Sequence, residues 1–368
     1  MCQKSYSGSQ SGHSDISGQT QPNRAPTTHQ IRYNPATSKS KRNMKHGTYP
    51  MHHYLTLNGL DGPMLRQFGC DCARCTGRER LANTSASLIS LDDQGQTAHH
   101  ILFDVGLGVV DSLVQNPHLA GTKARLDWIV LTHWHPDHTL ELNRVAVSYR
   151  LRRRPDFRIP TWCRSGSADW LHREHGYDME YLLQPHKSGE YHRPGTLLPP
   201  LPIDLPGVTI TPVTVSHLRA DISPNDRHQT RYSCAVFIIE TARSKTVLLW
   251  DIDSENEWLV QPTTAAEKAA VQRLSGANHL FIDTGFWQYH RPRMSHPGFY
   301  NVRRIARTLQ PQETLLVHLS GHPDGPGQPA WGWSNAQWSA QAAQVWETEG
   351  LPGRVRVPAI GERFDLIS

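Results

Sequence analysis

Short apolar runs and longer amphipathic stretches alternate along most of this chain. The short runs are rich in Val, Ile, Leu and Phe and end at turn-forming residues, which is typical of β-strands, whereas the longer stretches have helical spacing. This alternation predicts an α/β fold. The predicted strands cover residues 54–59, 85–90, 98–104, 126–131, 208–215, 232–240, 245–250, 280–283 and 314–318, with closing strands within 355–366; helices are predicted after residue 138 and at 263–274, 299–308 and 335–349.

Two segments break this pattern. Residues 1–48 are rich in Ser, Gln, Asn, Thr and Lys with almost no large aliphatic side chains, which predicts a disordered tail. Its low acidic content is also compatible with mitochondrial targeting, although a plain tail on a cytoplasmic protein is the favoured interpretation. Residues 155–205 are rich in proline and predict an irregular insertion within one domain that spans residues 49–368.

The densest chemical signal is the sequence His-Trp-His-Pro-Asp-His at residues 133–138. It follows a predicted buried strand and precedes a predicted helix, and ligands often collect on such turns in layered α/β folds. Imidazole and carboxylate are good ligands for zinc, iron and manganese, and this cluster can serve two ions that share a bridge. A surface turn that is His-rich by chance is the alternative, because the chain has 22 His.

Composition limits the possible partners. The formal net charge of +5 is compatible with anionic substrates but does not by itself indicate nucleic-acid binding. No apolar run approaches the 18 or so residues of a membrane span, so we expect no membrane association. Six Cys in 368 residues do not indicate a disulfide scaffold, and three of them have a metal-like spacing, Cys70-x-Cys72-x-x-Cys75.

The H-x-H-x-D-H pattern resembles that of the metallo-β-lactamase fold, an αββα sandwich with a dimetal site at the sheet edge. The resemblance implies further ligands at later strand ends, and the chain has a suitable residue after each of three such runs. It also implies a ligand-orienting role for Asp104 in Asp104-Val-Gly106, with an ordinary turn aspartate at a strand end as the alternative. Glu141 stands where the family commonly has Gly. Asp253 lies two residues after Asp251, and the sequence does not assign it a role. The implied ligands are His133, His135 and His217 for one metal, Asp137, His138 and His318 for the other, and Asp251 between them.

The cysteine cluster narrows the resemblance to the phosphoribosyl cyclic phosphate phosphodiesterases of the carbon–phosphorus lyase pathway. In that family three cysteines and a histidine hold a structural zinc, which here implies Cys70, Cys72, Cys75 and His322 as ligands. The spacing from His318 to His322 is one residue longer than usual. Reduced free thiols are the alternative. The same resemblance gives His296 the role of proton donor to the leaving group, with a loop-surface histidine as the alternative.

The implied function is hydrolysis of a small, cyclic phosphodiester through a metal-bridged hydroxide, with Asp137 and His296 as catalytic residues. The implied cofactors are two divalent active-site metals, zinc or manganese, and one structural zinc. A tRNA-processing-type nuclease, a thioester or lactone hydrolase and a non-catalytic zinc-stapled scaffold are the alternatives. We expect a small anionic phosphodiester as the partner rather than nucleic acid, and the sequence is compatible with a homodimer.

Overall fold

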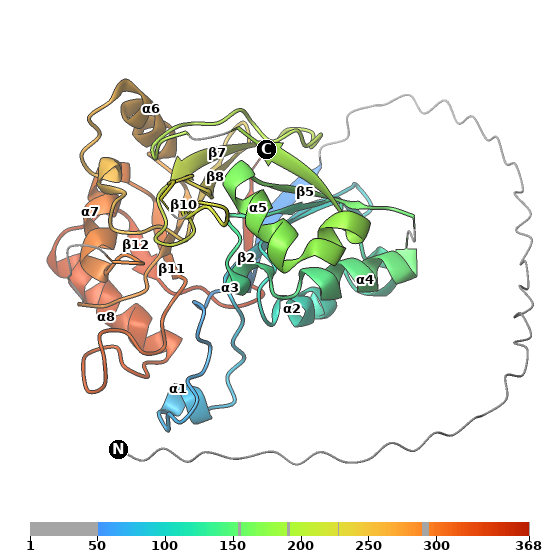
Figure 1. The fold of residues 1–368 in the computed structure, drawn as a ribbon. Coiled ribbons are helices and arrows are strands. Elements are labelled where there is room, and N and C mark those ends of the chain that lie inside the picture. The colour runs from blue at the N-terminus through green and yellow to red at the C-terminus, as the bar shows by residue number, and fades with distance from the viewer. Residues whose placement is uncertain (1–50, 154–155, 190–191, 227, 289–293, 368) are drawn as a thin grey trace, which may run out of the picture. The chain divides into compact units, whose positions relative to one another are not determined.

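The computed structural model describes residues 51–153, 156–189, 192–226, 228–288 and 294–367 (Figure 1). The predicted tail at residues 1–48 lies outside the described residues. None of the helices in the described ranges is long and apolar enough to cross a membrane. The description below concerns the unit that begins at Thr48.

One mixed sheet has seven strands in the order β13-β1-β2-β3-β4-β5-β6. Strands β13, β1, β2 and β3 pair antiparallel, whereas β3 to β6 pair parallel. The strands are β1 (His52–Gly59), β2 (Ser85–Leu91), β3 (Thr97–Phe103), β4 (Trp128–Val130), β5 (Ile159–Arg164), β6 (Leu183–Ser188) and β13 (Arg363–Leu366).

The second mixed sheet has six strands in the order β12-β11-β10-β9-β8-β7. Strands β7, β8 and β9 pair antiparallel in turn, and β9 to β12 pair parallel. As a result, β7, β9 and β11 all run in the same direction and end at the same edge. The strands are β7 (Thr209–Val215), β8 (Cys234–Glu240), β9 (Lys245–Leu249), β10 (His279–Asp283), β11 (Glu313–Val317) and β12 (Arg354–Arg356).

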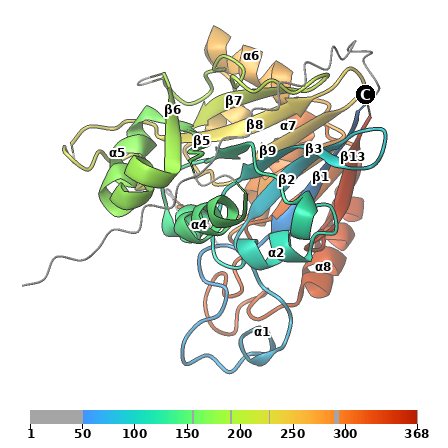
Figure 2. The same cartoon turned by 90° about the vertical axis from the view of Figure 1, so that its right-hand side faces the viewer.

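Helices cover the outer faces of the two sheets, as Figure 2 shows. One apolar cluster joins α2, α4 and α5 to the seven-stranded sheet, and a larger one joins the facing sheets to α6, α7 and α8. This αββα arrangement confirms the predicted fold class. The α-helices are α1 (Ala73–Thr76), α2 (Val109–Gln115), α3 (Pro136–Thr139), α4 (Leu142–Arg153), α5 (Ser165–Glu174), α6 (Ala265–Leu274), α7 (Phe299–Leu309) and α8 (Asn335–Thr348); 3₁₀ turns lie at Gly121–Lys123 and Glu257–Leu259, and a π turn at Asp178–Leu182.

The interpretation of residues 155–205 as an irregular insertion was wrong for its first part. This segment holds β5, α5 and β6, which continue the parallel half of the seven-stranded sheet. Its prolines fit that structure for positional reasons. Pro185 lies on the edge strand β6, and Pro160 precedes the two β5 residues that pair with β4, and both positions tolerate the missing N–H.

Candidate metal centre

The ligand residues suggested by the sequence lie at the C-terminal ends of strands from both sheets. The 133–138 segment follows β4 in the seven-stranded sheet. In the six-stranded sheet, His217 follows β7, Asp251 follows β9 and His318 follows β11. Because these strand ends meet at one edge, residues that are 185 positions apart in the chain become neighbours.

These seven residues form two adjoining groups whose potential ligand atoms lie within 4.8 Å of one another. In the second group, Asp251 lies 2.8 Å from His138 Nε2 through Oδ2 and 2.9 Å from His318 Nε2 through Oδ1. Asp251 Oδ2 is also 3.5 Å from His133 Nε2 in the first group, so this carboxylate occupies the bridging position. The first group consists of His133, His135 and His217, and the second of Asp137, His138, Asp251 and His318.

The chemistry of these atoms fits divalent cations. Although they lie close to one another, both carboxylate oxygens of Asp251, and Nε2 of His133 and of His138, are buried and make no well-directed hydrogen bond among the described residues, an arrangement that is costly unless a ligand satisfies them. Burial lowers the pKa of His133 and His217 well below 6.5 and that of His135 to about 4. These imidazoles are therefore neutral at pH 7, as metal ligands must be.

The carboxylates of the site remain ionised. Burial raises the pKa of Asp137, but the adjacent His138 outweighs this effect and holds the pKa well below its usual value. Asp251 shows the same balance, with His318 and His138 as the opposing neighbours. Burial lowers the pKa of His138 and His318, but the neighbouring carboxylates outweigh this effect and raise it well above 6.5, so metal binding there would release protons from these two rings. Imidazoles beside charged carboxylates form the donor set that zinc, manganese and iron accept.

Asp104, at the end of β3, orients one of the candidate ligands. Its carboxylate lies 2.9 Å from Nδ1 of His138 and accepts hydrogen bonds from the backbone N–H of Thr132 at 2.8 Å and from the Thr132 hydroxyl. The turn also depends on Gly106, because a Cβ there would lie 1.8 Å from the carbonyl oxygen of Asp137. Asp104 thus lies where the resemblance implied an orienting carboxylate.

The cysteine cluster forms a separate group of candidate ligands. His322 Nε2 lies 3.3 Å from the sulfurs of Cys70 and Cys75 and 3.4 Å from that of Cys72. The four side chains thus converge as tetrahedral zinc requires, and the extra residue before His322 does not prevent this.

His296 lies beside the first two groups, and a residue that sequence reasoning missed holds it there. Its Nδ1 is 2.9 Å from the fully buried carboxylate of Asp283, at the end of β10. Asp283 is also 3.6 Å from Nδ1 of His318. The available signal was that Asp283 ends a predicted strand, as Asp251 and His318 nearly do, which places it at the same edge.

The β-lactamase superfamily domain matches residues 99–319, more than half of the chain. The chain belongs to the β-lactamase superfamily. A comparison with curated proteins gave no match. Among solved structures, a diphosphatase of the PhnP family is 20% identical with a TM-score of 0.56, and the alignment covers 87% of this chain and 100% of that one.

Two other solved structures, also at low sequence identity, support the metallo-β-lactamase fold. Zinc-bound PqqB from Methylobacterium extorquens is 14% identical, with a TM-score of 0.59 and coverage of 85% of this chain and 100% of that chain. The metallo-β-lactamase fold protein YhfI from Bacillus subtilis is 15% identical, with a TM-score of 0.56 and coverage of 86% and 100%. At these sequence identities the structural similarity shows the fold alone. Membership of the superfamily identifies the chain as a hydrolase of the metallo-β-lactamase type.

Glu141, where this superfamily motif commonly has Gly, has a structural partner. Its carboxylate accepts a hydrogen bond from the backbone N–H of Val110 at 2.8 Å, in the first turn of α2, and pairs with Arg144 at 2.7 Å. Glu141 is only 5% exposed. It therefore ties α2 to α4, and the departure from Gly does not disturb the ligand set.

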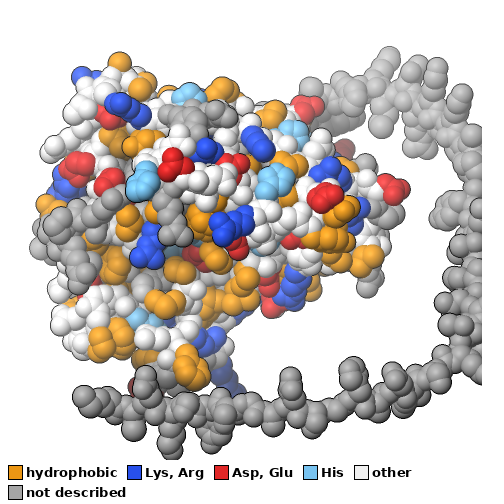
Figure 3. All heavy atoms as spheres, viewed as in Figure 1, with side chains coloured by type: hydrophobic (Ala, Val, Ile, Leu, Met, Phe, Trp, Pro, Cys, Tyr) orange, Lys and Arg blue, Asp and Glu red, His pale blue; other side chains and the backbone are white. Residues whose placement is uncertain are grey.

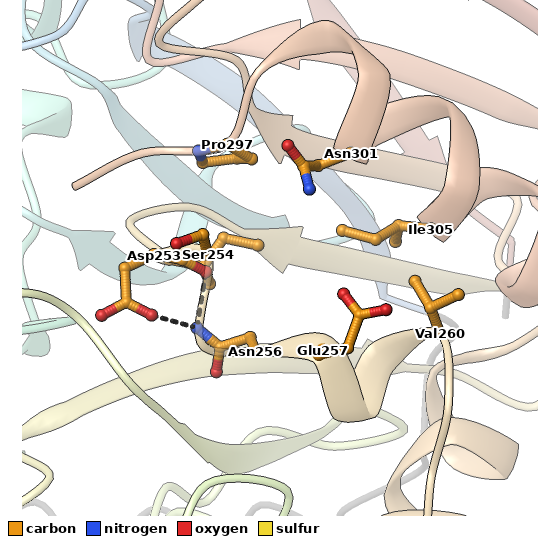
Figure 4. Close-up of a pocket in the computed structure, with 9 residues that line it drawn as sticks. Asp253, Ser254, Asn256, Glu257, Val260, Pro297, Asn301 and Ile305 are labelled. Atoms are coloured by element: carbon orange, nitrogen blue, oxygen red, sulfur yellow. Dashed lines mark hydrogen bonds between the residues drawn. The ribbon is translucent and has the colours of Figure 1, made fainter. Parts of the chain in front are cut away.

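Asp253 does not face solvent. It is 2% exposed and accepts hydrogen bonds from the Ser216 hydroxyl at 3.0 Å and from the backbone N–H of Glu255 at 2.9 Å. Figure 4 shows its carboxylate joined to Asn256, beside a small cavity that Pro297 also lines. Because Ser216 precedes His217, Asp253 supports the loop that carries a candidate ligand.

Proposed function

We propose that this chain is a dinuclear metal-dependent phosphodiesterase that acts on a small, cyclic phosphodiester. The observation that carries the proposal is the complete set of seven ligand residues with the His296–Asp283 pair next to it. The solved structure described as a PhnP-family diphosphatase supports phosphoester chemistry on this fold. Zinc or manganese in the active site and zinc in the cysteine site are the metals that we propose.

The carboxylates and His296 have different roles in the proposed reaction. Asp251, between the two groups of imidazoles, and Asp137, in the second group, supply negative charge that would offset part of the charge of two divalent cations. Divalent metals bound there would lower the pKa of a shared water and neutralise charge on the phosphate oxygens. Because Asp283 engages Nδ1 of His296, Nε2 is the nitrogen left to protonate a leaving group.

The charge on His296 suits this role. Burial lowers its pKa, but the carboxylate of Asp283 outweighs this and leaves the pKa above 6.5. The carboxylate of Asp283 thus favours the protonated imidazole that a proton donor needs. On the face that Figure 3 shows, Lys and Arg side chains are intermingled with Asp and Glu rather than gathered in one basic patch, so this face lacks the charge pattern of a nucleic-acid interface.

The test compares leaving groups. Asp137→Ala should abolish hydrolysis of both a bis-aryl phosphodiester and a cyclic nucleoside phosphodiester. His296→Gln should slow the cyclic ester by about 10²–10⁴-fold, because its alkoxide needs a proton, but should slow the aryl ester far less. The exposed His172 provides a matched control, and His172→Gln should leave both rates unchanged.

Three results would count against the proposal. Equal losses on both esters in His296→Gln would remove its role as proton donor. Turnover of thioesters or lactones without any phosphodiester hydrolysis would show a thioester or lactone hydrolase instead. Absence of active-site metal in the wild-type protein would leave a zinc-stapled scaffold.

A further inference from the structure

Trp250 makes a polar contact between the two sheets directly beneath the candidate metal centre. It follows β9 and precedes Asp251, and its side chain is completely buried. Its Nε1–H donates a hydrogen bond of 2.9 Å to Oδ2 of Asp104. Asp104 ends β3 in the seven-stranded sheet, whereas β9 lies in the six-stranded sheet. The bond therefore links the strand that carries the bridging carboxylate to the residue that orients His138.

The acceptor in this contact is heavily engaged. Oδ2 of Asp104 also lies 2.9 Å from Nδ1 of His138 and accepts the Thr132 hydroxyl at 2.9 Å. The carboxylate has no exposed surface, so its charge depends entirely on such donors. Indole can donate but not accept a hydrogen bond, so Trp250 adds a fixed donor to those that hold this carboxylate, the N–H and hydroxyl of Thr132.

Both groups of candidate ligands draw on both sheets. The first combines His133 and His135 with His217, and the second combines His138 with Asp251 and His318. A change in the spacing of the sheets would therefore separate ligands within each group. Bound metals tolerate only a few tenths of an ångström of such change.

We propose that the indole N–H of Trp250 is a positioning group for the metal centre. Through Asp104 it sets the orientation of His138 and its placement relative to Asp251. This inference rests on the proposed metal centre but goes beyond it, because it assigns a role to a residue outside the ligand set. Trp250 would change the affinity of the site for metal, and it would not contact the substrate.

The substitution that tests this is Trp250→Phe, which keeps an aromatic ring and removes the donor. Trp338 in α8 is the matched control, because it is also fully buried but its Nε1 has no hydrogen-bond partner among the described residues. Trp338→Phe leaves a similar gap in the core without breaking a bond. Comparing the two variants separates loss of the N–H from loss of ring volume.

Cobalt(II) titration provides the readout, since visible absorption separates an imidazole- and carboxylate-bound ion from a thiolate-bound one. In Trp250→Phe the active-site affinity should fall about tenfold, at the lower end for loss of an outer-shell partner. Trp250→Phe should also lose more thermal stability than Trp338→Phe, because it removes a donor from a buried carboxylate, and Trp338→Phe should keep wild-type cobalt affinity. Unchanged affinity in Trp250→Phe, or an equal fall in Trp338→Phe, would overturn the inference while the proposed function stood.

A second measurement uses the wild-type protein and does not require the variant to fold. The indole N–H resonance of Trp250, assigned through its contact with the Phe281 ring, should shift when active-site metal is added and return when it is removed. An indole N–H resonance that does not shift when metal is added would overturn the inference. A wild-type protein that binds no metal at this site would overturn both this inference and the proposed function.

Discussion

Replacing Arg74 by Met should destabilise the folded chain by about 3–5 kcal/mol at pH 8, because it leaves one partner of a buried ion pair alone. Arg74 lies in α1, between Cys72 and Cys75, and its guanidinium contacts the carboxylate of Asp61. Each of these two side chains is 1% exposed. Asp61 also accepts the backbone N–H of Ala82 at 3.1 Å. The carboxylate is therefore held in place after the substitution, with no charge partner.

The effect should be smaller in acid. Burial raises the pKa of Asp61 from 3.8 to about 6, although Arg74 acts against this rise. A carboxyl group whose pKa rises on folding stabilises the protein below the lower value, and this contribution is lost as the pH rises through the higher one. Without Arg74 the pKa rises further, so at pH 5 Asp61 is neutral in the variant and the unpaired charge disappears.

Urea unfolding followed by tryptophan fluorescence, on zinc-loaded protein at pH 8 and pH 5, measures both effects. Arg66→Met, in the segment before Cys70, is the control, because Arg66 is exposed and, within the part of the chain that the structure describes, donates to the carbonyl oxygens of Cys75, Gly77 and Glu79. It should cost about 1 kcal/mol or less. A loss below about 1 kcal/mol for Arg74→Met at pH 8, or an equal loss at both pH values, would refute the reasoning.

Three further substitutions have defined outcomes. Burial lowers the pKa of His100 to about 4, so wild-type stability should fall by up to about 3 kcal/mol as the pH drops from 6.5 to 4; His100→Gln should flatten this slope in urea titrations, and identical slopes would contradict it. Cys72→Ser should remove one zinc per chain and spare the active-site metals, as measured by metal analysis; parallel loss of both would count against separate sites. Glu141→Ala should lower stability by about 1–3 kcal/mol, because the N–H of Val110 loses its acceptor, with metal content unchanged; altered metal content would place Glu141 in the ligand network.

The ligand residues were open to prediction because they occupy a simple position. Each of His217, Asp251 and His318 lies within two residues of the end of an apolar run, and parallel strands bring such ends to one edge. The pattern at 133–138 is dense enough to be read without a fold. The structure brings all of these residues together, and metal binding by them remains a prediction that metal analysis can test.

The residues that sequence reasoning missed act through tertiary contacts. Asp283 and Trp250 stand at ordinary strand ends, and only the packing of the two sheets gives each a partner, His296 and Asp104 respectively. The interpretation of residues 155–205 failed for a different reason. Proline content was taken to exclude strands, but whether a missing N–H matters depends on which neighbour a strand pairs with, and the sequence does not show this.

The distance along the chain between the ligands has a consequence for biosynthesis. Cys70 and His322 are separated by 252 positions, and both active-site groups also draw on residues far apart. During translation, strands β1 to β6 can emerge while every candidate metal cluster still lacks a ligand. The second group needs His318 and the cysteine site needs His322, so neither can close until most of the chain has left the ribosome. Metal can therefore fill the second group and the cysteine site only after residues 318 and 322 have been synthesised, whereas the ligands of the first group are all present once residue 217 has been made.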